Sequence, residues 1–151
     1  MRVEFQRTQV EFPSAELGYL RDSTDALADV DELRRRIATD GYLFIRGLID
    51  RDAVLDARRV VMEHLQEQDA LVEGTPLMEG VMPRDGRSVG MKRVAYRAEV
   101  LRVLEAPELH SFYRRLYGEE PATFTHKWLR AVGNEKFTGS HMEWSTCPIW
   151  R

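Results

Sequence analysis

Two side chains near the end of the sequence have the types and the spacing of a metal-binding pair. His141 and Glu143 are separated by one residue. Successive side chains of a β-strand point to opposite faces, so within a strand these two would share a face. An imidazole nitrogen and a carboxylate oxygen are two of the three ligands of the two-histidine, one-carboxylate site, which binds Fe(II) and leaves positions open for substrate and oxygen.

The spacing alone is weak evidence for a metal site, because a histidine-x-glutamate pair often occurs by chance on a solvent-exposed strand. The preceding segment supplies further candidates. If residues 123–132 and 137–144 paired as a direct hairpin, His126, Trp128 and Arg130 would lie on the face that carries the pair. His126 is therefore a candidate third ligand, and Trp128 a candidate pocket wall or core residue.

Two cations in the same segment could bind an acidic substrate or cosubstrate. Lys127 and Arg130 both precede the His-x-Glu pair, and a guanidinium matches a carboxylate in a two-bond fork. The alternative is that both are charged positions on a half-exposed strand.

The histidines His64 and His110 fall inside predicted helices, and we expect neither to take part in catalysis.

Longer stretches resemble the phytanoyl-CoA dioxygenase family. The first is Asp40-Gly-Tyr-Leu-Phe-Ile-Arg-Gly-Leu-Ile-Asp50 with the helix after it, and the second is Lys127-Trp-Leu-Arg-Ala-Val-Gly133 running into Phe137-Thr-Gly-Ser-His-Met-Glu143. The resemblance extends from about Asp31 to Glu143, and the second stretch is the more specific half. In a double-stranded β-helix successive strands lie in opposite sheets, so this resemblance argues against the direct hairpin and weakens the case for His126.

The resemblance implies a non-haem iron dioxygenase, an oxidoreductase that uses Fe(II), with 2-oxoglutarate and O₂ as cosubstrates, to hydroxylate a small organic molecule. His141 would be the proximal iron ligand, and Glu143 would stand where the family has aspartate, one methylene longer. The family's distal histidine and 2-oxoglutarate-binding arginine have no counterpart before Arg151. We therefore expect the N-terminal part of such an enzyme, or a shortened relative.

The alternative function is a non-catalytic remnant or interaction module of the same fold. A sheet with too few strands to close leaves unpaired backbone groups at its edge, and these favour self-association.

The composition fits one domain over residues 1–151. The formal charge is −3, from 22 basic and 25 acidic residues, and no basic patch suggests nucleic acid as a partner. No apolar run approaches the roughly 18 residues of a membrane span, and the charged N-terminus lacks the pattern of a signal peptide. With one cysteine in the chain, these features predict a cytoplasmic protein without a membrane partner.

The predicted fold class is α+β, with N-terminal helices packed on an incomplete double-stranded β-helix (a jelly-roll, cupin-like fold). Asp29 and Asp50 are predicted N-caps and Gly41 and Gly118 predicted helix ends. Hydrophobic periodicity and turn residues then give the elements. These are extended chain over 3–12, helices over 29–40, 50–69, 97–105 and 107–117, a buried strand over 42–46, and strands over 123–132 and 137–144.

Three further predictions concern packing. The apolar face of the second helix is expected to be Val54, Ala57, Val61 and Leu65, and the arginine run 34–36 is expected to face water. Residues 73–93 are too long for an ordinary connection and predict a mobile loop, either a substrate lid or plain surface. The residues of this loop that would meet a substrate are Met78, Met82, Arg84, Arg87, Met91, Lys92 and Arg93.

Overall fold

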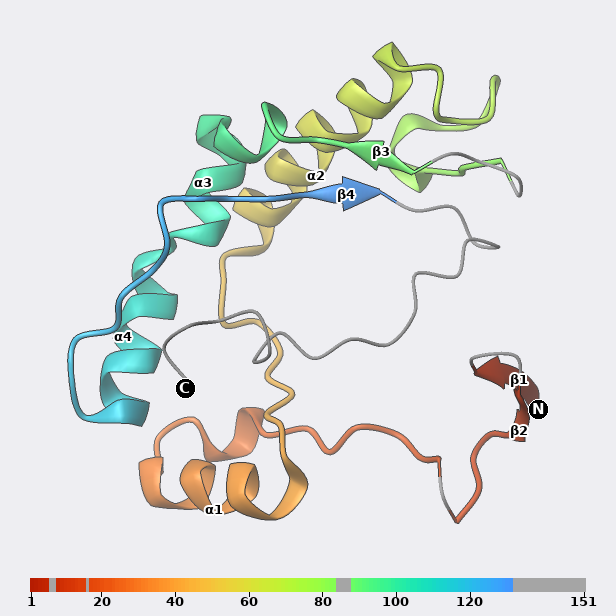
Figure 1. Cartoon of the computed structure of the whole chain (residues 1–151). Helices are drawn as coiled ribbons and strands as arrows, with labels where there is room; N and C mark the ends of the chain where they lie inside the picture. Colours follow the sequence, from red (N-terminus) through yellow and green to blue (C-terminus); the bar gives the residue numbers. More distant parts are fainter. Residues whose placement is uncertain (6–7, 16, 84–87, 132–151) are drawn as a thin grey trace, which may run out of the picture.

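The computed structural model describes residues 1–5, 8–15, 17–83 and 88–131 (Figure 1). The helices are α1 (Val30–Asp40), α2 (Arg51–Glu67), α3 (Ala98–Leu104) and α4 (Pro107–Tyr117), with short 3-10 helices η1 (Thr24–Ala26), η2 (Leu77–Glu79) and η3 (Val94–Tyr96). The strands are β1 (Arg2–Phe5), β2 (Thr8–Glu11), β3 (Val89–Gly90) and β4 (Arg130–Ala131). No helix of the described ranges is long and apolar enough to cross a membrane.

The helix ends follow from local sequence. The Asp29 carboxylate accepts a hydrogen bond from the Glu32 N–H at 3.0 Å, and the Asp50 carboxylate accepts one from Ala53 at 2.8 Å. Each bond satisfies a backbone donor that the first helical turn leaves free. At the other end of α1, Gly41 adopts a φ of 78°, a left-handed conformation that glycine reaches without strain. The predicted caps are confirmed.

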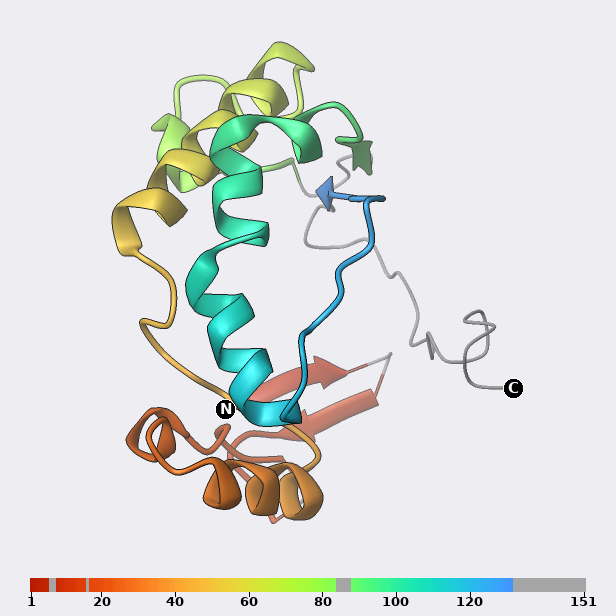
Figure 2. The same ribbon diagram turned by 90° about the vertical axis from the view of Figure 1, so that its left-hand side faces the viewer.

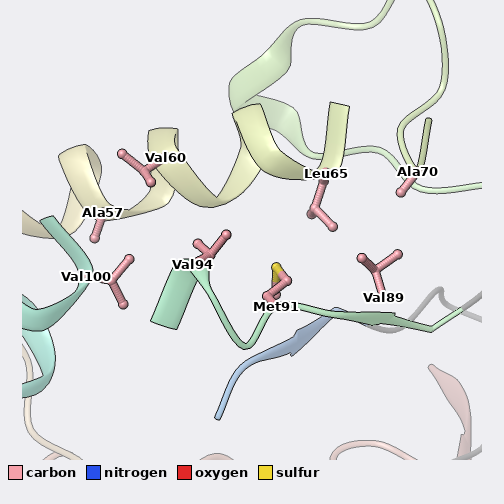
Figure 3. Packing of buried hydrophobic residues seen from close by; sticks show 8 residues of the cluster. All are labelled: Ala57, Val60, Leu65, Ala70, Val89, Met91, Val94 and Val100. Carbon is pink, nitrogen blue, oxygen red and sulfur yellow. The ribbon is translucent and has the colours of Figure 1, made fainter. Parts of the chain in front are cut away.

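The buried side chains form two clusters. The α2–α3 cluster lies between α2, η3, α3 and β3 (Figure 3) and consists of Ala57, Val60, Leu65, Ala70, Val89, Met91, Val94 and Val100. The α1–α4 cluster consists of Ala26, Leu33, Phe112 and Leu116. Figure 2 shows α3 and α4 following one another almost end to end, so that together they span from one cluster to the other.

The buried face of α2 is rotated from the predicted one. Ala57 and Leu65 are buried as expected, but Val54 is 40% exposed and Val60 is 4% exposed. The reason is that α3 packs along one side of α2, and η2 and η3 also contact it. The periodic pattern identifies the helix but does not determine which neighbour will cover it.

Part of the predicted 73–93 loop belongs to the core instead. Val89 lies in β3 and Met91 is only 4% exposed, and both pack in the α2–α3 cluster. Earlier in the same segment, Arg58 of α2 donates hydrogen bonds to the Met78 carbonyl oxygen at 2.8 and 3.1 Å. The prediction of a mobile lid or surface loop is therefore wrong for Val89 and Met91.

The predicted strand over 42–46 is also wrong. The backbone there forms one isolated parallel bridge, between Phe44 and Asp22. The Ser23 N–H donates to the Phe44 carbonyl oxygen at 2.7 Å, and the Arg46 N–H donates to the Thr24 hydroxyl at 2.8 Å. The apolar stretch thus lies against an irregular segment, so no ladder forms.

The strands of the described residues pair in two small sheets. The predicted extended N-terminus is a hairpin of β1 and β2, in which Val3 lies opposite Val10. β3 and β4 pair antiparallel, with Val89 opposite Ala131. Of the strand predicted over 123–132, residues 123–131 are described, and among these only β4 has strand pairing. The described residues combine helices with small sheets, and the double-stranded β-helix remains a prediction.

The arginine run 34–36 is only partly exposed, contrary to expectation. Arg36 is 6% exposed. Its guanidinium donates to both carboxylate oxygens of Asp25, at 2.7 and 2.9 Å, and to Glu32 at 2.7 Å. It also donates to the Asp22 carbonyl oxygen at 3.1 Å. A planar guanidinium has five N–H donors and can bond to all these oxygens at once. Arg36 therefore holds α1 against the turn that precedes it.

The carboxylate of Glu32 predicts a pH dependence of stability. Hydrogen bonds from Arg35 and then Arg36 lower the pKa of Glu32 from 4.5 to about 2. A depressed pKa in the folded state stabilises the fold above the unfolded pKa, and this contribution disappears as the pH falls from 4.5 towards 2. We expect the Glu32→Gln variant to have a lower urea midpoint than the parent at neutral pH, with the difference shrinking over that interval.

The control is Glu73→Gln, because Glu73 is exposed and the structure gives its side chain no ion pair within the described residues. This variant should match the parent at each pH. A difference between parent and Glu32→Gln that stays constant on acidification would show that Glu32 does not contribute through its charge.

Candidate functional site

The predicted metal pair lies beyond the part of the chain that the structure describes. His141 and Glu143 both fall after Ala131, the last described residue. Within residues 1–5, 8–15, 17–83 and 88–131, no group of three or more histidine, cysteine, aspartate or glutamate side chains is arranged to hold a metal ion. The structure therefore places the segment that leads to the pair, but not the pair.

That segment is anchored on the α2–α3 cluster through β4. The Met91 N–H donates to the Leu129 carbonyl oxygen at 3.1 Å, which extends the pairing of β3 with β4. Leu129 and Ala131 pack against the cluster. Because side chains alternate along extended backbone, Arg130, between these two residues, and Trp128, before them, are directed to the other side.

Trp128 and Arg130 occupy this outer side. Trp128 is 65% exposed, and the Arg130 guanidinium carbon lies 5.2 Å from the centroid of its ring. A cation held over an indole face is attracted by the ring quadrupole. The structure thus brings together two of the four candidate site residues of this segment, Trp128 and Arg130, as a pair open to solvent.

Lys127 is held differently from Arg130. Its side chain is 11% exposed, and its Nζ forms an ion pair with Glu105 at 3.1 Å and donates to the Phe124 carbonyl oxygen. Its backbone N–H donates to the Tyr96 hydroxyl at 3.0 Å. The ammonium charge is already compensated, so of the two predicted cations Arg130 is the more available for an acidic ligand.

His126 is exposed and forms no hydrogen bond or ion pair with another described residue. Its distance from His141 and Glu143 is undefined, because those residues are outside the described ranges. Its role as third ligand remains a prediction.

A cavity beside α4 was not predicted from the sequence. We call it the α4 cavity. After Gly118 the chain turns back and runs beside α4 (Figures 1 and 2). In this returning segment, Pro121, Ala122 and Thr123 line the cavity. Its volume is about 200 Å³. The wall on the helix side includes Leu104, Leu109, His110, Tyr113 and Tyr117.

The α4 cavity adjoins a more polar depression, and His110 and Thr123 line both spaces. Arg114 lies in this depression and is bound to both carboxylate oxygens of Glu120, at 2.6 and 2.7 Å. These hydrogen bonds lower the pKa of the Glu120 carboxyl. Glu105, on the same surface, is paired with Lys127, so each charge has a partner.

The sequence does contain one signal for this cavity. His110, Tyr113 and Tyr117 are spaced by three and four positions, which puts them on one side of a helix. The sequence does not predict the segment that covers this side, because no local pattern shows that residues 121–123 fold back onto the helix.

Comparison of the whole chain with protein-family models, with curated proteins and with solved structures finds no match.

Proposed function

We propose that this chain belongs to an Fe(II)- and 2-oxoglutarate-dependent oxygenase that hydroxylates a small organic molecule. The observation that carries the proposal is the His141-Met-Glu143 sequence, which follows a strand anchored on the α2–α3 cluster. In support, α1 and α2 lie where the family resemblance expects a helix on either side of the 42–46 stretch, although that stretch itself forms one isolated bridge and no strand.

The donor chemistry of the pair fits iron. An imidazole nitrogen from His141 and a carboxylate oxygen from Glu143 match two positions of the facial triad typical of non-haem Fe(II). When bound, the iron would supply the activation of O₂, with 2-oxoglutarate as cosubstrate. Of the two predicted cations, Arg130 is better suited to bind a carboxylate of 2-oxoglutarate, since it is exposed whereas Lys127 is already paired.

Anaerobic calorimetric titration with Fe(II) tests the proposal. We expect the parent chain to bind one iron, and His141→Ala and Glu143→Ala each to bind it at least about tenfold more weakly, since even the loss of a residue that only supports a ligand costs about that much. His64→Ala is the matched control, because His64 lies on α2 and is not a predicted ligand.

Turnover of 2-oxoglutarate to succinate by the iron-loaded chain is the second measurement. The His126→Ala variant tests whether His126 is the third ligand. Its affinity for Fe(II) should fall only if His126 binds the iron. Equal iron affinity in the parent and in His141→Ala would contradict the oxygenase proposal, and would favour the non-catalytic interaction module instead.

A further inference from the structure

We propose that the α4 cavity is a binding site for a small, neutral, planar aromatic molecule that carries one hydrogen-bonding group, of the size of a phenol or an indole. This inference does not depend on the proposed iron site. It rests on the size of the cavity, the character of its walls and the state of the polar groups at its mouth.

The volume sets the size of the ligand. The α4 cavity measures about 200 Å³, and an apolar protein cavity of about 150 Å³ is enough to bind benzene. One aromatic ring with a substituent, or two fused rings, therefore fits. A longer or branched molecule would have to extend out of the cavity.

The walls favour a flat aromatic body. The rings of Tyr113 and Tyr117 are stacked, with centroids 5.5 Å apart and an angle of 22° between their planes. Tyr113 is 39% exposed and Tyr117 is 59% exposed, so part of each side chain remains available to contact a ligand. Aromatic pairs gain about 0.5–1.5 kcal/mol beyond simple burial. Leu104 and Leu109 complete an apolar lining on the helix side.

The polar group of the ligand would meet His110. This side chain lies where the apolar cavity joins the polar depression, and no described residue forms a hydrogen bond with its imidazole. A neutral imidazole has one nitrogen that donates and one that accepts, so it can bind a hydroxyl or an indole N–H. Small-molecule sites commonly combine an apolar lining with a few such groups.

The charges at the mouth favour a neutral ligand. Arg114 is paired with Glu120, and Glu105 is paired with Lys127. An anionic or cationic ligand would have to break one of these ion pairs or enter without a partner, and an unpaired charge in an apolar site is costly. Phenol should therefore bind more tightly than benzoate or benzylammonium, which are similar in size.

Ligand-observed NMR titration of the full chain with phenol, indole, benzoate and benzylammonium tests the proposal. We expect phenol and indole to bind, and Ala122→Phe to weaken both by at least about tenfold, because the new ring fills the cavity from an exposed position. His110→Leu removes the polar partner while keeping a side chain of similar bulk, and should weaken phenol by about fivefold.

The matched control is His64→Leu, the same substitution at a helical histidine that does not line the cavity. It should leave the binding of both probes unchanged, and circular dichroism should show that each variant keeps its helix content. Phenol binding that is absent, or that Ala122→Phe leaves unchanged, would overturn the site. Tighter binding of benzoate or benzylammonium than of phenol would overturn the neutral class of ligand.

Discussion

Replacing Leu65 by alanine is expected to lower the free energy of unfolding by about 2–5 kcal/mol, the range measured when large aliphatic side chains are truncated in protein cores. Leu65 is 2% exposed and lies in the α2–α3 cluster, where it is among the largest fully buried side chains of the described residues. Truncation removes buried apolar surface and leaves a cavity that the surrounding helices fill only in part.

Urea unfolding monitored by circular dichroism measures this change. Val54→Ala is the matched control on the same helix, because Val54 was predicted to be buried and is 40% exposed in the structure. Its effect should be within about 0.5 kcal/mol. Equal losses in the two variants would mean that the buried face of α2 is the one predicted from the sequence.

The second large effect is expected from Phe112→Ala, at about 3–5 kcal/mol. Phe112 is 5% exposed and joins α4 to Leu33 of α1 in the α1–α4 cluster. The Arg34 Nε donates to the Leu116 carbonyl oxygen at 2.9 Å across the same contact. Loss of the ring therefore weakens the principal apolar contact between α1 and α4.

Ser111→Ala is the control for Phe112→Ala, since Ser111 is the neighbouring residue and is exposed. The slope of the urea transition is informative as well as its midpoint, because the slope scales with the surface exposed on unfolding. A reduced slope in Phe112→Ala would show that the α1–α4 cluster opens before the α2–α3 cluster. A loss no larger than that of Ser111→Ala would contradict the packing described here.

The helices could be predicted from the sequence because their signals are local. Asp29 and Asp50 bond to backbone donors three residues away, and Gly41 and Gly118 stop helices by their own conformation. Pairing of strands depends instead on partners distant in sequence. The 42–46 segment has the composition of a strand, but the segment beside it forms no ladder with it.

Burial of charged residues was equally beyond prediction. Arg36 follows two exposed arginines, and it is buried where it bonds to Asp25 of the preceding turn. In the candidate site, too, contacts between segments distant in sequence could not be predicted. The alternation that directs Trp128 and Arg130 to one side could be anticipated, whereas the ion pair of Lys127 with Glu105 depends on how the chain returns beside α4. The His141 and Glu143 predictions fall outside the described residues.

The pairing of β3 with β4 also bears on the order of events during synthesis on the ribosome. The buried residues of the α2–α3 cluster lie in α2, β3, η3 and α3, apart from Ala70 and Met91, which lie in the connections between these elements. Contacts between neighbouring segments form early, because little chain entropy is lost in bringing them together. β4 emerges later and adds Leu129 and Ala131 to a surface that is already assembled. The nascent chain can thus bury most of this apolar surface before β4 emerges from the ribosome.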